Sequence, residues 1–156
     1  MLVAESGLDF DRLYERYSRL VHGILLAHVP YADAEDLMQD VFLQAIEKLG
    51  TLSDPRAVGG WLATIARRRA IDFHRGRRPT EPIENHDRGR SDSRGEALLV
   101  LAEIRHLPEA YRETLILRLV EGMTGPEIAE RTGLTHDSVR VNLHRGMKLL
   151  RERLEG

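Results

Sequence analysis

Hydrophobic side chains recur at helical spacing along most of the chain, and no stretch shows the alternation typical of a strand. The pattern predicts helices over residues 8–29, 34–49, 61–75, 97–106 and 109–121. Pro30 and Pro108 follow two of these helices, because the residue before a proline disfavours helical backbone. Asp33 is the expected N-cap of the second helix and Gly50 its C-cap. We therefore expect an all-α protein.

Two segments between the predicted helices lack this pattern. Residues 51–60 contain the turn signals Asp54-Pro55 and Gly59-Gly60, so a loop is expected there. Residues 79–95 are rich in proline, glycine, serine and charged residues, which is typical of a flexible linker. We therefore predict two small helical domains, residues 5–78 and 96–155, joined by a flexible linker over residues 79–95.

The last third of the chain has the sequence signals of a helix-turn-helix. Thr124 and Glu127 have the spacing of a capping box, and Pro126 is tolerated in the first turn because its missing N–H has no helical partner there. Gly133 suits the left-handed turn that ends the first helix, and Thr135 is the expected cap of the second.

The second helix of this motif is predicted to have two unlike faces. One is an apolar stripe of Val139, Leu143, Met147, Leu150 and Leu154. The other carries side chains that can bond base edges and phosphates in a major groove: Arg140, Asn142, His144, Arg145 and Lys148. A charged helix face is by itself often only solvated surface. Ala129, Gly133 and Val139 add the spacing of a helix-turn-helix, which favours DNA binding.

Composition excludes several classes of protein. The 156 residues include no cysteine, which rules out disulfides and thiolate sites and fits a reducing cytoplasm. No apolar run is long enough for a membrane span, and the seven histidines lack metal-ligand spacing. Because no phosphate loop, nucleophile elbow or carboxylate pair stands out, we expect no enzyme, no cofactor and no metal.

Charge is unevenly distributed although the net charge is only -2. The first fifty residues are acidic. Six arginines then crowd one short stretch, at positions 67, 68, 69, 75, 77 and 78. Such separation suggests an acidic surface for a protein and a basic surface for nucleic acid.

Four motifs follow one another along the chain: Phe10-x-x-Leu13-Tyr14-x-x-Tyr17, Asp33–Phe42, Trp61-Leu62-x-x-Ile65-Ala66-Arg67, and Leu107-Pro108-x-x-Tyr111-Arg112 before the helix-turn-helix. Their order resembles that of bacterial RNA polymerase sigma factors of the extracytoplasmic-function (ECF) group, over nearly the whole chain. The resemblance implies a factor that binds core RNA polymerase and directs it to promoter DNA. It also implies a further partner, an anti-sigma protein. No membrane partner is expected.

The resemblance assigns three sets of residues. Polymerase contacts are expected from Asp36, Gln39, Asp40 and Phe42. Contacts to the melted -10 element are expected from Trp61, Arg67, Arg68, Arg69, Asp72 and Arg75, although Trp61 also fits the core. Contacts to the duplex -35 element are expected from Thr135, Ser138, Arg140, Val141, Asn142, His144, Arg145 and Lys148.

Two departures leave the promoter sequence open. The family usually has asparagine where Arg68 stands, and an arginine can only donate hydrogen bonds. A polar residue often stands where Val141 is, and valine can only touch a thymine methyl. Two alternatives also stay open: a stand-alone helix-turn-helix regulator, and a sigma mimic that titrates an anti-sigma protein. The regulator gives no role to the Asp33–Phe42 motif or to the arginine-rich third helix. Loss of the basic residues would favour the mimic, and they are present.

Overall fold

The computed structural model describes residues 10–76 and 92–156, without the side chains of residues 92–94. Within these ranges the chain is helical and contains no strand, as expected of an all-α protein. The first group comprises α2 (Phe10–Leu26), α3 (Tyr31–Lys48), the short 3-10 helices η1 (Leu49–Thr51) and η2 (Pro55–Ala57), and α4 (Val58–Arg75). The second comprises α5 (Asp92–Ile104), α6 (Glu109–Leu119), α7 (Gly125–Thr132) and α8 (His136–Glu155). No described helix is long and apolar enough to cross a membrane.

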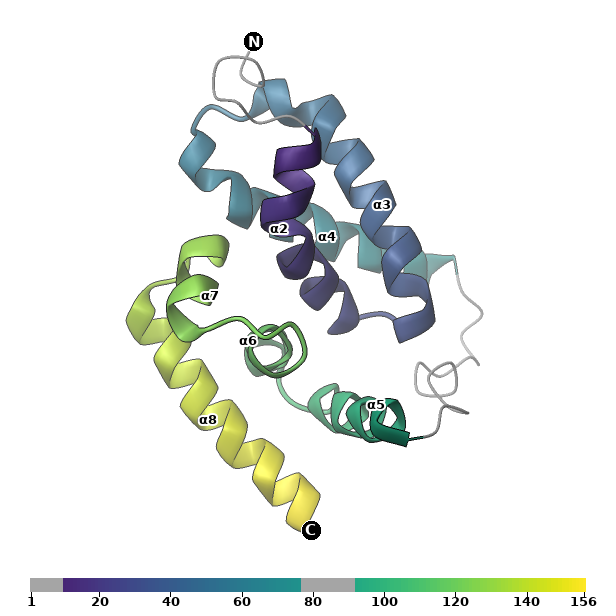
Figure 1. Cartoon of the computed structure of the whole chain (residues 1–156), viewed down its shortest axis with the longest axis vertical. Helices are drawn as coiled ribbons and strands as arrows, with labels where there is room; N and C mark the ends of the chain where they lie inside the picture. Colours follow the sequence, from purple (N-terminus) through teal and green to yellow (C-terminus); the bar gives the residue numbers. More distant parts are fainter. Residues whose placement is uncertain (1–9, 77–91) are drawn as a thin grey trace.

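The first domain is a bundle in which α2, α3 and α4 pack against one another (Figure 1). Leu13, Leu20 and Ile24 of α2 are fully buried, as the helical spacing predicts. Phe42 of α3 is also fully buried, and its ring centroid lies 5.0 Å from that of Tyr14. Burying a large apolar side chain contributes about 1.5–3 kcal/mol, so this cluster fixes the mutual orientation of the helices.

The second domain is built around α6, which contacts α5, α7 and α8 (Figure 1). Leu115 and Ile116 of α6 are fully buried, and Ile128 and Val139 anchor the two helices of the helix-turn-helix. Gly146 lets α8 lie close to α6, because a Cβ there would stand 3.0 Å from the Leu115 side chain. One side of α8 therefore packs against the rest of the second domain, and the other side of α8 faces outward.

The predicted caps of the helix-turn-helix are confirmed. The Thr124 hydroxyl accepts from the Glu127 N–H at 3.2 Å, and the Glu127 carboxylate accepts from the Thr124 N–H at 3.1 Å. Gly133 ends α7 with φ 82°, a left-handed conformation that suits glycine. The Thr135 hydroxyl then accepts from the Ser138 N–H at 3.0 Å at the start of α8. These local signals set the angle between α7 and α8.

The apolar stripe of α8 is confirmed except at its end. Val139 and Leu150 are buried, and Leu143 and Met147 are half-buried against the core. Leu154 is 55% exposed, so its assignment to the stripe is wrong. The last turn of α8 extends past the helices that cover the rest of the stripe (Figure 1).

Two predicted caps of the first domain are wrong. The helix α3 begins at Tyr31, with Pro30 in extended backbone as its N-cap residue, so Asp33 lies in the first turn. A proline directly before a helix has a fixed φ that fits this extended position. Gly50 is not a left-handed C-cap, because α3 continues through right-handed Leu49 into η1.

Two predicted loop positions are helical instead. Gly59 and Gly60 lie inside α4, which begins at Val58. A Cβ on Gly59 would stand 1.7 Å from the Arg131 carbonyl oxygen, so this glycine permits close approach to α7 rather than a turn.

The helix α5 begins at Asp92, inside the predicted linker of residues 79–95; residues 79–91 of that prediction lie outside the described residues.

We predict that Thr124→Ala lowers the free energy of unfolding by about 1 kcal/mol, because it removes one half of the capping box. Urea denaturation followed by circular dichroism measures this change. Thr64→Ala is the matched control: Thr64 is an exposed residue in the middle of α4 whose hydroxyl only bonds the Gly60 carbonyl. Alanine favours a helix interior, so the control should not destabilise. Equal losses in both variants would contradict a capping role.

Candidate nucleic-acid interface

The outward face of α8 carries the residues predicted to contact duplex DNA. Thr135, Ser138, His144, Arg145 and Lys148 are all exposed. Their backbone is fixed by the buried side chains on the opposite side of the helix. A helix held in this way by a helix-turn-helix can enter a major groove without first refolding.

Three further residues of this predicted set are less available to DNA, because one forms an ion pair and two are less exposed. Arg140 is exposed, but its guanidinium donates to Asp137 at 3.1 Å. Both side chains are more than three-quarters exposed, so the pair is weak and a phosphate can replace the carboxylate. Val141 is 37% exposed, and Asn142 is half-buried.

The helix α4 carries the residues predicted to contact the melted element. Arg68, Asp72 and Arg75 are exposed, while Trp61 is half-buried against the core. Arg69 bonds Asp40 of α3 at 3.0 Å. Arg77 and Arg78 of the arginine-rich stretch lie outside the described residues. The exposed part of this helix is therefore basic, with Asp72 the acidic member of the predicted set.

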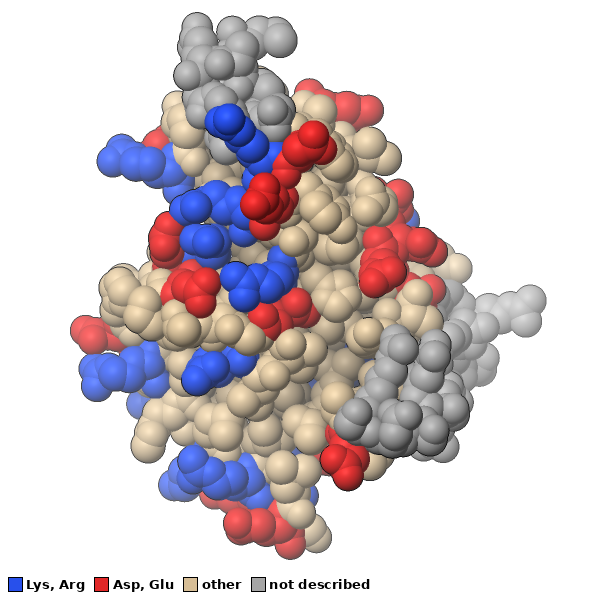
Figure 2. All heavy atoms as spheres, viewed as in Figure 1, with Lys and Arg blue, Asp and Glu red and all other residues tan. Residues whose placement is uncertain are grey.

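The residues predicted to contact polymerase lie on α3. Asp36, Gln39 and Asp40 are exposed, and Figure 2 shows acidic side chains gathered on the right of the molecule, where α3 runs. Phe42 is 0% exposed, so its assignment as a direct polymerase contact is wrong. Its ring packs against Phe10 and Tyr14, so Phe42 supports α3 from inside.

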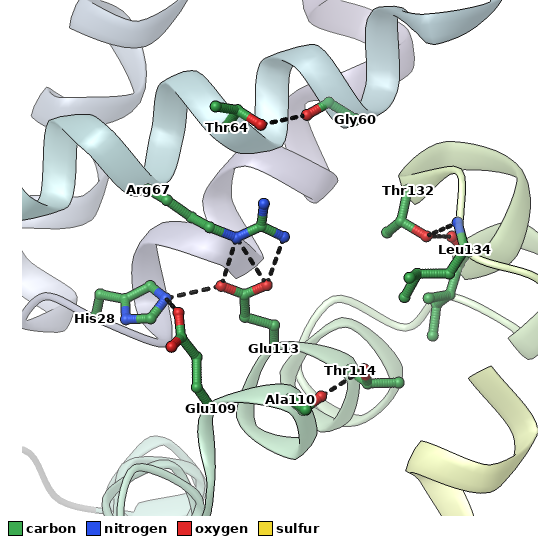
Figure 3. A network of polar contacts seen from close by, with 11 residues as sticks. His28, Gly60, Thr64, Arg67, Glu109, Ala110, Glu113, Thr114, Thr132 and Leu134 are labelled. Atoms are coloured by element: carbon green, nitrogen blue, oxygen red, sulfur yellow. Dashed lines mark hydrogen bonds and ion pairs between the residues drawn. The ribbon is translucent and has the colours of Figure 1, made fainter. Parts of the chain in front are cut away.

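Arg67, a predicted DNA contact, forms an ion pair with a residue of the second domain in this structure. Its Nε and Nη2 donate to the two oxygens of Glu113 of α6, at 2.8 Å for the shortest bond (Figure 3). The Glu113 carboxylate also contacts His28 Nε2 at 2.8 Å. A single side chain of the second domain thus joins two elements of the first. No local sequence signal indicates this contact, because its partners are far apart in the chain.

The environment of Glu113 favours its charged form. Burial alone would raise the pKa of this carboxyl, but hydrogen bonds with His28 and Arg67 and their charges outweigh burial and lower the pKa below its usual value. The hydrogen bond with Glu113 in turn raises the pKa of Arg67. The pair is therefore ionised on both sides at neutral pH.

One group of described residues has ligand atoms close enough together for a metal ion. These are His28, Glu109 and Glu113, whose donor atoms lie within 4.8 Å of one another. Arg67 already bonds both oxygens of Glu113 and places a positive charge beside them. A divalent cation would have to displace this guanidinium, so the group fits an ion-pair network better than a metal site.

The chain matches known proteins over both domains. Residues 13–80 match the family model of Sigma-70 region 2, and residues 97–150 match that of Sigma-70, region 4. RNA polymerase sigma factor SigV of Bacillus subtilis is 33% identical over 78% of this chain and 76% of that protein. The ECF RNA polymerase sigma factor SigF of Caulobacter vibrioides is 31% identical over 78% of this chain and 71% of that protein.

A solved structure has a similar fold. The structure of CnrH in complex with the cytosolic domain of CnrY has a TM-score of 0.63 to this chain and is 26% identical to it. The likeness covers 94% of this chain and 87% of that one. With both domains matched in order and relatives matched over most of their length, the chain belongs to the RNA polymerase sigma factors of the ECF group.

Proposed function

We propose that this protein binds core RNA polymerase and directs it to promoters by contacting a -10 element with α4 and a -35 element with α8. The observation that carries the proposal is the exposed polar face of α8, held by a fully capped helix-turn-helix. Membership of the sigma factor family supports the same conclusion. Members of that family are transcription factors rather than enzymes, so the polymerase performs the chemistry.

Each surface has a physical basis for its proposed partner. Exposed arginines of α4 can bind phosphates of a single strand, with an affinity that falls as salt concentration rises. Arg140, His144 and Arg145 can donate to base edges and phosphates in the major groove. Asp36, Gln39 and Asp40 offer an acidic and polar strip on α3 for a basic surface of the polymerase.

A regulatory protein partner is part of the proposal. The CnrH structure, which resembles this chain over both domains, holds the cytosolic domain of CnrY. We infer that a partner of the anti-sigma class binds this protein and covers its DNA and polymerase surfaces.

The proposed function is tested by transcription from a fragmented genomic library with bacterial core polymerase, with and without this protein. New 5′ ends that share two spaced sequence blocks are the expected result. An absence of new starts, together with tight binding to duplex DNA alone, would favour a stand-alone regulator. An absence of new starts with tight binding to an anti-sigma protein would favour a sigma mimic.

The library experiment identifies a -35 sequence block. We predict that Arg145→Ala weakens binding to a duplex of that sequence by about 1–3 kcal/mol and relaxes selection at one base position. Fluorescence anisotropy with a set of singly substituted duplexes measures both effects. Arg151→Ala is the matched control, because Arg151 is also exposed on α8 but points about 120° away around the helix axis. A readout role for Arg145 would be contradicted by unchanged base selection.

We predict that Asp40→Ala weakens binding to core polymerase and leaves duplex -35 binding intact. The variant also breaks the ion pair with Arg69, but that pair is exposed and contributes at most about 1 kcal/mol to stability. Glu152→Ala removes an exposed acidic side chain from α8 and serves as the control for the loss of one negative charge. If both kinds of binding fell together in Asp40→Ala, the loss would reflect misfolding rather than a polymerase contact.

A further inference from the structure

A cleft lies between α4 and α6, beside the ion pair of Arg67 and Glu113. Its lining includes Arg67, Ile71 and His74 from α4, Glu109 and Arg112 from α6, and His28. Its volume of about 390 Å³ falls in the range of about 300–1,000 Å³ that is typical of small-ligand sites, which often form where domains meet. The cleft is therefore large enough for a small organic molecule.

Arg112 is the residue of this cleft that lacks a partner. Its Nε is buried, yet no described residue accepts a hydrogen bond from it. Glu109 precedes Arg112 by one turn of α6, but its carboxylate lies toward His28, at 3.8 Å from Nε2 (Figure 3). A buried donor without an acceptor has lost its hydration without compensation. An acceptor supplied by a ligand would therefore be stabilised at Arg112.

The charges along the boundary between the domains explain why Arg112 is unpaired. Every ion pair that the described residues form across this boundary takes its basic or imidazole partner from the first domain and its carboxylate from the second. The pairs are Arg67–Glu113, His28–Glu113, His28–Glu109, His22–Glu121, Arg19–Glu127 and Arg16–Glu130. Arg112 is a basic residue of the second domain, and the first domain lines the cleft with Arg67 and two histidines rather than with a carboxylate. The unbalanced charge of Arg112 favours an anion in the cleft.

Arg67 can contact the same anion while it keeps its ion pair. Glu113 accepts from Nε and Nη2 of Arg67, and Figure 3 shows Nη1 directed away from the carboxylate. Because a guanidinium carries N–H donors on all of its nitrogens, Nη1 remains available to a second acceptor. A phosphate group has more terminal oxygens than a carboxylate, so it can accept from both arginines at once.

One wall of the cleft is apolar. Ala70 and Ile71 of α4 line it, and the Ile71 side chain is 51% exposed. The His74 imidazole beside them is fixed, because its Nε2 donates to the His28 carbonyl. An inorganic ion would leave Ile71 in water, whereas a ligand with an apolar part would bury it and gain affinity. The cleft therefore suits a molecule that is anionic at one end and apolar at the other.

We propose that the cleft between α4 and α6 binds a small phosphate ester, with its phosphate on Arg112 and Nη1 of Arg67 and its apolar part against Ile71. Glu109 is 62% exposed, so water screens its charge, and its carboxylate can accept from a hydroxyl or amino group of the same ligand. This binding goes beyond the proposed function, because it requires neither promoter DNA nor polymerase.

The first test compares a phosphate ester with its two halves. Phenyl phosphate, inorganic phosphate and phenol are titrated into the full chain at fixed ionic strength and followed by calorimetry. We expect phenyl phosphate to bind at least about tenfold more tightly than either half, because it alone combines the charged and the apolar contacts. The same titration followed by nuclear magnetic resonance should shift the Nε–H signal of Arg112.

Two variants locate the binding. Arg112→Lys keeps the charge and removes the guanidinium fork, so we expect about tenfold weaker binding of phenyl phosphate. Arg118→Lys is its control, because Arg118 is exposed on the same helix and does not line the cleft. Ile71→Glu places a carboxylate on the apolar wall and should abolish binding. Leu43→Glu, at a leucine of α3 that is 58% exposed, is the control for that change.

Three results would overturn the proposal. The first is equal affinity for inorganic phosphate and phenyl phosphate, which would mean that the apolar wall takes no part. The second is unchanged affinity in whichever of Arg112→Lys and Ile71→Glu folds, as judged by circular dichroism. The third is a shift of the Arg112 signal by a random-sequence single-stranded oligonucleotide but not by phenyl phosphate, which would assign the cleft to a DNA backbone phosphate. Transcription by core polymerase enters none of these measurements, so failure here is distinguishable from failure of the proposed function.

Discussion

The Glu113 carboxylate is the point at which the two halves of this protein are held in register. It lies on α6, the central helix of the second domain, and bonds Arg67 of α4 and His28 beyond the end of α2. Because the Glu113 side chain is only 12% exposed, removing Arg67 would leave its charge with poor access to water. This ionised group and its partners therefore help to fix the positions of α2, α4 and α6 relative to one another, together with the buried Arg105, which donates to the carbonyls of Leu26 and Val29.

The two domains share one feature. In each, a helix is fixed by its buried apolar face and exposes a polar face. In the first domain the buried Phe42 supports the strip of Asp36, Gln39 and Asp40 on α3. In the second, Val139 and Leu150 support Arg145 and its neighbours on α8. The side chains that we propose to bind DNA and polymerase are thus carried on helices with buried inner faces, so exposed residues can change without loss of the core.

Sequence reasoning succeeded where the cause of a structure is local. The capping box of Thr124 and Glu127 and the left-handed Gly133 depend on residues only a few positions apart, so their spacing was sufficient. It failed at Gly59, which resembles a turn residue but lies inside α4, where the missing side chain leaves room for the carbonyl of Arg131 from far along the chain. Glu113 was missed for the same reason, since an acidic residue on a helix has no local sign of its partners.

The assignment of Phe42 shows a second limit of reasoning from a motif. Motif membership identified a run of residues on α3, but an interface can use only the side chains that reach the surface. Phe42 lies four residues after Met38 and three before Ala45, an apolar spacing that indicates the inward face of a helix, and the structure shows all three side chains buried. Periodicity was therefore the better guide to the role of this residue than its place in the motif.

The one-sided charge of the interface bears on how freely the domains can be exchanged between relatives. Among the residues that the structure describes, every ion pair between the domains takes its basic or imidazole partner from the first domain and its carboxylate from the second. A second domain transplanted from another sigma factor would meet α2 and α4 with different charges at these positions. Its own helix-turn-helix could remain intact while the chimera lost the ion pairs between its domains. Modularity in reading DNA therefore does not imply modularity in the resting shape of the chain.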